Sequence, residues 1–335
     1  MLMKLLYEHS NMNPAGGSGS VETLQRMTEL FPIRKAPRGF ELLREETPQG
    51  TAYDRMRRRN PSEKPGKSGK PEKSGESEKS GKSEKQAVTG KGKILLYLHG
   101  GGYVQGLIAL YPTFMKDLYK MAKGGYEIIL LDYRTAPEAV YPTQLGEALD
   151  LWEDLTGRQG IAPGDIVVAG DSAGANLTLA LLLKLRDAGR SLPAAAICLS
   201  LWGDMTASGK SFAKNYKKDI FFGDPKGELT EEKRQELLQG GIYRFLGQAD
   251  RRDPYVSPVF ADFTGFPPVL LLSGSEEMLL SDARRVYKKL AKTTPESELH
   301  IVKGMFHIFT VFEHYCPEGR QSMKIVAAWL RKYLQ

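Results

Sequence analysis

An α/β fold with a mostly parallel sheet and helices on both faces is predicted for this chain of 335 residues. Three observations support this prediction. From residue 93 onward, short apolar runs alternate with amphipathic helical patterns. One run passes directly into a helix through Gly-Asp-Ser-Ala-Gly at residues 170–174, and another ends in His-Gly-Gly-Gly at residues 99–102. Buried parallel strands joined by crossover helices produce such an alternation, and ligands collect beyond the carboxyl ends of the strands.

Residues 1–59 carry mixed helix and turn signals. Apolar residues recur at helical spacing from Val21 to Leu30, and Phe31-Pro32 ends that pattern. Apolar residues return near Phe40. We therefore expect several short helices here, which would form the N-terminal part of a helical cap over a larger body.

Residues 60–92 differ sharply in composition from the rest of the chain. Lys-Ser-Gly and Glu-Lys-Ser units recur, and few apolar side chains are present. Such a segment cannot bury enough surface to offset its ordering entropy, so it is interpreted as a flexible linker. The net charge of +7 is concentrated between residues 55 and 93. A basic arm for nucleic acid or an acidic membrane is the alternative, but interleaved glutamates and the lack of aromatic residues disfavour it.

Residues 93–335 are expected to form the core domain. The expected strands are residues 94–98, 127–131, 166–169, 195–200, 269–273 and 299–302, and the expected helices are residues 112–123, 143–156, 173–188, 281–292 and 318–333. Residues 205–250 interrupt the alternation with a polar, Lys-rich stretch and one amphipathic helix near residues 230–245. An insertion above the strand ends occupies the position of a lid, so we expect it to complete the cap.

Composition excludes several classes of protein. Hydrophobic residues at 41% and charged residues at 26% are ordinary for a soluble globular protein. Of the two cysteines, Cys198 lies in an apolar run and is expected to be a buried thiol, so a disulfide framework is not predicted. We find no signal peptide and no window of transmembrane length, and we expect a cytoplasmic location. No metal-ligand spacing and no dinucleotide-binding glycine motif occurs, so no metal or cofactor is expected.

Ser172 occupies the centre of a Gly-x-Ser-x-Gly sequence between a strand and a helix. A direct strand-to-helix turn exposes its middle residue, and small residues on either side let the strand and the helix approach. By itself the pattern is weak evidence, because residue frequencies give roughly 0.2 chance matches. The His-Gly-Gly-Gly sequence is more specific, with about 0.006 expected matches. Consecutive glycines can present backbone N–H groups to the oxyanion that develops in acyl transfer.

Together, residues 99–102 and 170–174 resemble the hormone-sensitive-lipase-like branch of the α/β-hydrolase fold, which includes many bacterial carboxylesterases. Residues 132–138, 253–258 and 304–307 agree with this resemblance, which covers residues 93–335 well and residues 1–59 only loosely. The resemblance implies an oxyanion hole formed by the N–H groups of three residues, Gly101, Gly102 and Ala173. It also implies that His99 supports this loop and carries no proton.

A nucleophilic serine needs a histidine and an acid, and in this fold they follow it along the chain in the order acid, then histidine. His300, His307 and His314 follow Ser172. His307 comes a few residues after the last short strand, so it can reach back over the sheet, and it matches the family's histidine. His300 is expected to face the packed layer or solvent, and His314 a helix surface.

Two glutamates follow the strand at residues 269–273, where the family usually presents an aspartate. Counting forward to the next helix places Glu277 at the acid position. Glu276 is the alternative if the loop shifts by one residue. Asp282 is interpreted as a helix N-terminal residue. Asp171 either braces the turn or touches substrate, and bracing is favoured.

The sequence thus predicts a serine carboxylesterase whose catalytic residues are Ser172, Glu277 and His307. The resemblance implies a small-molecule ester with a short acyl chain as substrate. Acetylated sugars, lactones and amides remain alternatives for the same residues, as does a non-catalytic ligand receptor of the same fold, such as the plant gibberellin receptor. We expect neither a nucleic-acid partner nor a membrane partner, and a homodimer is left open.

Overall fold

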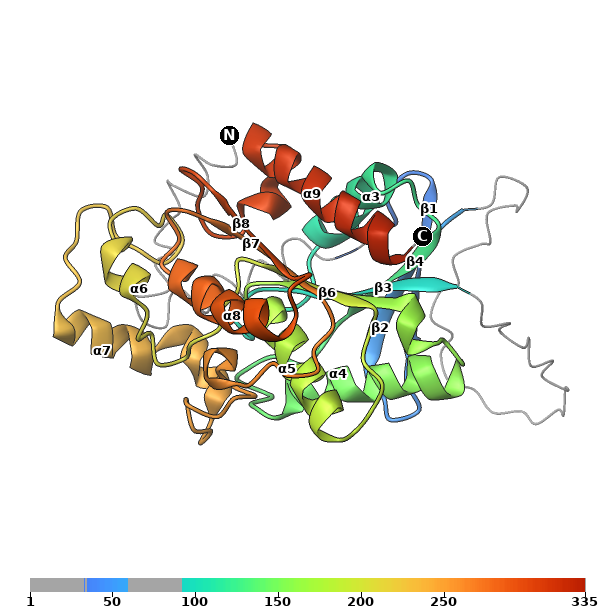
Figure 1. Ribbon diagram of the computed structural model, residues 1–335, viewed down its shortest axis with the longest axis horizontal. Coiled ribbons are helices and arrows are strands. Elements are labelled where there is room, and N and C mark those ends of the chain that lie inside the picture. The colour runs from blue at the N-terminus through green and yellow to red at the C-terminus, as the bar shows by residue number, and fades with distance from the viewer. Residues whose placement is uncertain (1–32, 34, 60–91, 335) are drawn as a thin grey trace, which may run out of the picture.

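The computed structural model describes residues 33, 35–59 and 92–334. Its centre is an eight-stranded sheet with the strand order β1-β2-β4-β3-β5-β6-β7-β8 (Figure 1). The strands are β1 (Phe40–Glu46), β2 (Ala52–Arg58), β3 (Lys93–Leu98), β4 (Tyr126–Leu131), β5 (Ile166–Asp171), β6 (Ala195–Leu199), β7 (Val269–Gly274) and β8 (Glu298–Val302). Strands β3 to β8 pair in parallel, whereas β1 and β2 join the sheet in antiparallel orientation.

Helices cover both faces of the sheet, as predicted. The long helices of the core are α3 (Leu110–Met121), α4 (Thr143–Glu153), α5 (Ala173–Asp187), α8 (Leu280–Thr293) and α9 (Pro317–Leu334). Helices α3 and α9 pack on one face and α4, α5 and α8 on the other (Figure 1). Strand β3 shows why its sequence is apolar throughout: Leu95 and Tyr97 belong to the first layer, while Leu96 and Leu98 belong to the second.

Short helical turns complete the described core. They are the π-helical turn Asp154–Arg158, which continues α4, and the 3₁₀ turns Pro163–Asp165, Pro258–Phe260 and Phe309–Phe312. The six strands and five helices that the sequence predicts after residue 93 are all present, within a few residues at each end. No helix in the described ranges is both long and apolar enough to cross a bilayer. Both cysteines are free, and Cys198 is buried as predicted.

The expectation of short cap helices throughout residues 1–59 is wrong for residues 40–58. These residues form β1 and β2, and β2 pairs with β4 at one edge of the core sheet. The polar sequence of β2 suggests an exposed segment, but the middle of the strand is buried. Its Arg55 lies among polar partners and not at the surface. Its guanidinium contacts Glu45 at 3.0 Å and Glu127 at 2.6 Å. The helix expected at residues 21–30 and the linker expected at 60–92 lie outside the described residues, except for Gly92 at the linker's end.

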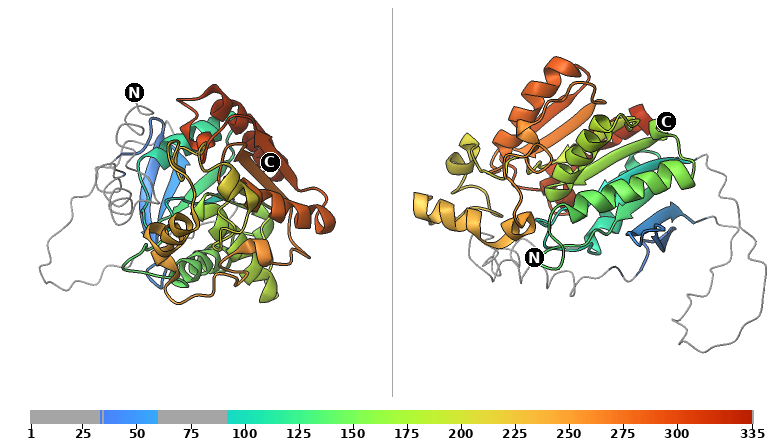
Figure 2. Two further views of the ribbon diagram at one scale, coloured as in Figure 1. Left: turned by 90° about the vertical axis from the view of Figure 1, so that its left-hand side faces the viewer. Right: turned by 90° about the horizontal axis from the view of Figure 1, so that it is seen from below.

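The insertion between β6 and β7 contains α6 (Lys210–Lys214), α7 (Glu231–Gln239) and the 3₁₀ helix Gly241–Leu246. The single helix expected near residues 230–245 is therefore divided in two. The division falls at Gly240 and Gly241, and Gly241 has a φ of 55° that few other residues tolerate. Figure 2 shows α6 and α7, in yellow and orange, set off from the two helical layers of the core.

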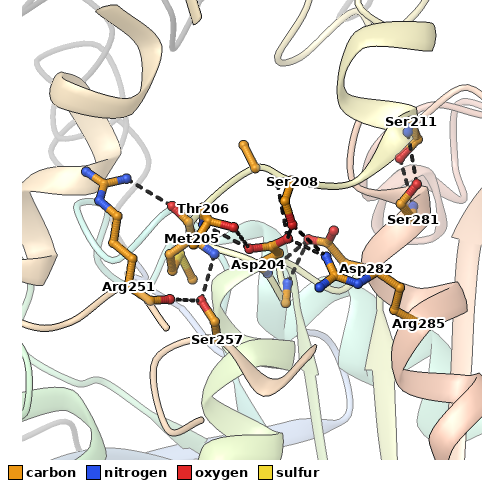
Figure 3. A network of polar contacts seen from close by, with 12 residues as sticks. Asp204, Met205, Thr206, Ser208, Ser211, Arg251, Ser257, Ser281, Asp282 and Arg285 are labelled. Atoms are coloured by element: carbon orange, nitrogen blue, oxygen red, sulfur yellow. Dashed lines mark hydrogen bonds and ion pairs between the residues drawn. The ribbon is translucent and has the colours of Figure 1, made fainter. Parts of the chain in front are cut away.

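A buried polar network attaches the start of this insertion to α8 (Figure 3). Asp282 lies in the first turn of α8, where the sequence predicts it, but its carboxylate serves another segment. It accepts the backbone N–H groups of Gly203 at 3.0 Å and Asp204 at 3.1 Å. Arg285 donates to the Asp204 carboxylate. The insertion is thus anchored to the helix that follows Glu277.

Candidate active site

Ser172 stands at the sharp turn between β5 and α5. Its φ of 52° and ψ of −115° lie in a region that non-glycine residues rarely adopt, at a cost of about 1–3 kcal/mol. Two contacts explain the glycines that flank it. A Cβ atom on Gly170 would lie 2.3 Å from the Gly174 carbonyl oxygen, and one on Gly174 would lie 1.9 Å from the Leu98 carbonyl oxygen. The strand and the helix therefore touch at this turn, as the sequence predicts.

His307 and Glu277 extend a line of hydrogen bonds from this serine. The Ser172 hydroxyl lies 2.9 Å from Nε2 of His307, and Nδ1 of His307 lies 3.3 Å from Oε2 of Glu277. All three side chains are buried. They follow the carboxyl ends of β5, β7 and β8, so the parallel sheet brings together residues that are up to 135 positions apart. The structure places Glu277 against the imidazole.

The other candidate residues have different partners. His300 contacts Glu298 at 2.7 Å, and His314 contacts Asp117 at 3.0 Å, both at the surface. Glu276 is only partly buried, and its backbone N–H donates to the Met305 carbonyl at 3.0 Å. None of these three side chains contacts Ser172 or His307 within the described ranges.

Ser200 holds the acid and the histidine loop together, a role that its sequence position alone does not reveal. Its hydroxyl donates to Oε1 of Glu277 at 2.8 Å and accepts the backbone N–H of Ile308 at 2.9 Å. The Gly274 N–H donates to the same carboxylate oxygen. The Glu277 carboxylate is therefore fixed from two sides before it meets His307.

Burial sets the proton affinities of this pair. Burial lowers the pKa of the His307 imidazole to about 4, although the negative charges of Asp219 and Asp171 oppose that effect. The ring is therefore neutral at neutral pH, and its Nε2 atom can accept a proton. Burial raises the pKa of Glu277, while the hydrogen bonds from Gly274 and Ser200 act in the opposite direction by stabilising the carboxylate.

The glycine loop lies beside the serine. Gly101 and Gly102 have φ values of 105° and 62°, which explains why glycine occupies both positions. Among the described residues, none accepts a hydrogen bond from the backbone N–H of Gly101, Gly102 or Ala173. Ala173 is also the first residue of α5, where the helix dipole favours negative charge. These three N–H groups remain available to a developing oxyanion.

Asp171 and His99 brace this loop. The buried Asp171 carboxylate accepts the N–H of Gly100 at 2.9 Å and the hydroxyl of Tyr97 at 2.8 Å, which supports the bracing interpretation. The His99 ring stacks on Tyr133 with centroids 4.1 Å apart, and its Nδ1 lies 2.7 Å from the Gly100 carbonyl. Both contacts agree with a supporting role for His99.

An apolar pocket is formed next to these residues, largely by the insertion. Its lining consists of Trp202, Phe212, Phe222, Leu237, Ile242, Tyr243, Met278 and Leu279. Three contacts place it beside the site. The Phe222 and His307 ring centroids are 4.6 Å apart. The backbone nitrogen of Trp202 lies 3.4 Å from the Ser172 carbonyl oxygen, to which its N–H donates, and a Cβ on Gly102 would lie 2.6 Å from Ile242.

Within the described ranges, one group of side chains has the spacing of metal ligands. It consists of Asp117, Glu313 and His314, and it shares no residue with the arrangement around Ser172.

A strained serine at a strand-to-helix turn, with an imidazole and a buried carboxylate behind it and a glycine loop beside it, defines the α/β-hydrolase class. Residues 95–311 match the alpha/beta hydrolase fold family, and the chain belongs to it. The chain is 35% identical over 240 residues to an acetyl-hydrolase of Streptomyces hygroscopicus, across 72% of this chain and 76% of that protein. An esterase of Acinetobacter venetianus is 33% identical over 236 residues, across 70% and 73% of the two chains.

Solved structures agree with this assignment. An esterase of the bacterial hormone-sensitive lipase family superposes with a TM-score of 0.72 at 27% identity, over 94% of this chain and 91% of that chain. An esterase/lipase from an uncultured bacterium gives a TM-score of 0.76 at 28% identity, over 99% and 97%. These similarities identify the protein as a carboxylic ester hydrolase.

Proposed function

We propose that this protein is a serine carboxylesterase that cleaves short-chain acyl esters through a Ser172–His307–Glu277 triad and an acyl-enzyme intermediate. The observation that carries the proposal is the unbroken line of contacts from the Ser172 hydroxyl through the imidazole to the Glu277 carboxylate. A buried, neutral imidazole is the base that such a hydroxyl needs.

Acylation begins when Nε2 of His307 takes the Ser172 proton and the serine oxygen attacks the ester carbonyl carbon. The carbonyl oxygen becomes negative and accepts hydrogen bonds from the N–H groups of Gly101, Gly102 and Ala173. Glu277 keeps the Nδ1 proton in place and stabilises the imidazolium. The tetrahedral intermediate then expels the alcohol, which receives its proton from His307.

Deacylation repeats these steps with water. His307 takes a proton from the water molecule, whose oxygen attacks the acyl carbon. The second tetrahedral intermediate releases the carboxylic acid and returns the proton to the Ser172 oxygen.

The apolar pocket supports a short acyl chain as the preferred substrate. Its lining consists of apolar side chains, among them the bulky Trp202, Phe212 and Phe222, which suit a small apolar acyl group. The similarity to a protein named acetyl-hydrolase points in the same direction. Acetylated sugars, lactones and amides present the same carbonyl group to these residues. An acyl-length series of p-nitrophenyl esters, run beside an amide and a lactone, compares the substrate classes.

The triad is tested by covalent labelling and by substitution. A fluorophosphonate probe should add to Ser172 in the native enzyme, as seen by peptide mass. Ser172→Ala should abolish both this labelling and the hydrolysis of p-nitrophenyl butyrate. Near-normal turnover by this variant would refute the proposed nucleophile, and unlabelled native enzyme would favour a non-catalytic receptor.

A further inference from the structure

Asp219 is a buried carboxylate for which the proposed mechanism has no role. It lies in the insertion between α6 and α7 and has no exposed surface. Its oxygens accept three backbone N–H groups, those of Phe221 at 2.9 Å, Phe222 at 3.3 Å and Met278 at 2.7 Å. No lysine or arginine in the described part of the chain forms an ion pair with it. A buried charge that is stabilised only by backbone N–H dipoles is unfavourable, so we expect this carboxylate to have a function.

Its three hydrogen bonds join two segments that both contact His307. Phe222, on one side, places its ring 4.6 Å from the imidazole, centroid to centroid. Met278, on the other side, directly follows Glu277 in sequence. Asn215 strengthens the same junction, because its side-chain amide donates to the Glu277 carbonyl at 2.8 Å. The Asp219 carboxylate therefore ties the insertion to the turn that carries the acid.

The charge of Asp219 also acts on His307. The acidic groups around the imidazole in the described structure are Glu277, Asp171 and Asp219. Asp171 is engaged by Tyr97, Tyr111 and the Gly100 N–H on the side of the glycine loop. Asp219 opposes the effect of burial on the His307 pKa more strongly than Asp171 does. Its negative charge favours the imidazolium form, which exists only after the ring takes the proton from Ser172.

We propose that Asp219 is a positioning residue for ester hydrolysis: it holds the Phe222 ring and the Glu277 turn against His307 and stabilises the imidazolium by its charge. This inference rests on the proposed function, in which His307 is the base. It assigns to the insertion a part in catalysis that goes beyond covering the pocket.

The test is Asp219→Asn, which keeps the size of the side chain and removes its charge. We expect kcat to fall about tenfold on the plateau of the pH profile. The midpoint of the acid limb of kcat/KM should move to a pH about one unit lower, because the imidazolium loses an attracting charge. A merely structural role would lower the plateau without moving the limb. Asp219→Glu should restore the limb toward its native position.

Asp282→Asn is the matched control. Asp282 is also buried and also accepts two backbone N–H groups, but its charge does not act on His307. The acid limb of the kcat/KM profile of the Asp282→Asn enzyme should stay at its native position. An Asp219→Asn enzyme with native kcat and a native limb overturns the inference, whereas an active Ser172→Ala enzyme would overturn the triad itself.

Asp219→Asn is a valid test only if it keeps the near-ultraviolet circular dichroism of a folded enzyme. If that signal is lost, Phe222→Ala tests the positioning role with the Asp219 carboxylate intact. The proposal then expects a lower kcat and an acid limb shifted upward, because water reaches the ring that Phe222 had shielded. Native values for both quantities would overturn the positioning role.

Discussion

At the scale of single residues, the neighbours of the triad decide what each member can do. Glu277 is useful only if its carboxylate is held ionised and aimed at Nδ1 of His307. The Gly274 N–H and the Ser200 hydroxyl hold one oxygen, which leaves the other for the imidazole. This division of the two oxygens explains how a fully buried carboxylate can serve the histidine.

Glu277→Gln is the sharpest test of this residue. The amide cannot stabilise the imidazolium and can donate to Nδ1 in the wrong tautomer, so kcat should fall about 1,000- to 10,000-fold. Glu276→Gln is the matched control, since Glu276 makes no side-chain contact with His307, and it should retain near-native kcat for p-nitrophenyl butyrate. The reverse pattern would move the acid to Glu276.

The pH dependence of hydrolysis should reflect the buried imidazole. His307 must be neutral to accept a proton, so activity is lost as pH falls through its pKa. Burial lowers that pKa to about 4, compared with about 6.5 for an ordinary histidine. The acid limb of kcat/KM should therefore have its midpoint clearly below pH 6.5. A stopped-flow profile of p-nitrophenyl acetate hydrolysis measures it, and a midpoint at or above 6.5 would contradict the structure.

At the scale of elements, the close contacts of α5 with β5 and with the end of β3 fix the nucleophile. Gly174→Ala would drive a Cβ atom into the Leu98 carbonyl. We expect a loss of about 2–4 kcal/mol in unfolding free energy, measured by urea denaturation, together with a large loss of kcat.

Gly146 offers the control for this substitution. It is exposed within α4, and a Cβ there would meet nothing within 4 Å. Gly146→Ala should leave kcat unchanged and stabilise the fold by about 0.5–1 kcal/mol, the ordinary gain of alanine over glycine in a helix. Equal stability of the two variants would mean that α5 does not touch the end of β3 at Gly174.

Elements with strong local patterns could be predicted, and those that depend on distant partners could not. Strands β3 to β8 are apolar runs between helices, and the five consecutive residues 170–174 predict the turn at Ser172. The sequence of strand β2 does not indicate a strand, because Arg55 is buried against Glu45 and Glu127 and no local pattern reveals those contacts. The same reason applies to Ser200, whose partners Glu277 and Ile308 lie 77 and 108 positions away in sequence. It also applies to the contact of Asp219 with Met278, which is 59 positions away.

At the scale of the whole molecule, the parallel sheet gathers the chemistry at one end. Strands β5, β7 and β8 each end in a loop that supplies one member of the line Ser172–His307–Glu277. The insertion after β6 adds the pocket wall and Asp219. The antiparallel strands β1 and β2 lie at the opposite edge of the sheet from β8, so they extend the scaffold without entering this site.

This topology bears directly on residues 60–91, which join β2 to β3 and lie outside the described residues. Strand β2 is antiparallel to β4, and β4 is parallel to β3, so the end of β2 and the start of β3 lie at the same end of the sheet. The register aligns Met56 with Ile128 and Ile128 with Leu95. Two strand spacings, roughly 10 Å, therefore separate Arg58 from Lys93.

Deleting residues 62–88 should therefore leave turnover and melting temperature nearly unchanged. The seven residues that would remain between Arg58 and Lys93 can span more than 20 Å when extended, roughly twice the distance required. The Lys-, Ser-, Gly- and Glu-rich composition offers almost no apolar surface whose burial could be lost. Calorimetry and p-nitrophenyl butyrate turnover of the shortened chain provide the measurement. A fall of several degrees, or a severalfold loss of kcat, would mean that this segment packs on the enzyme.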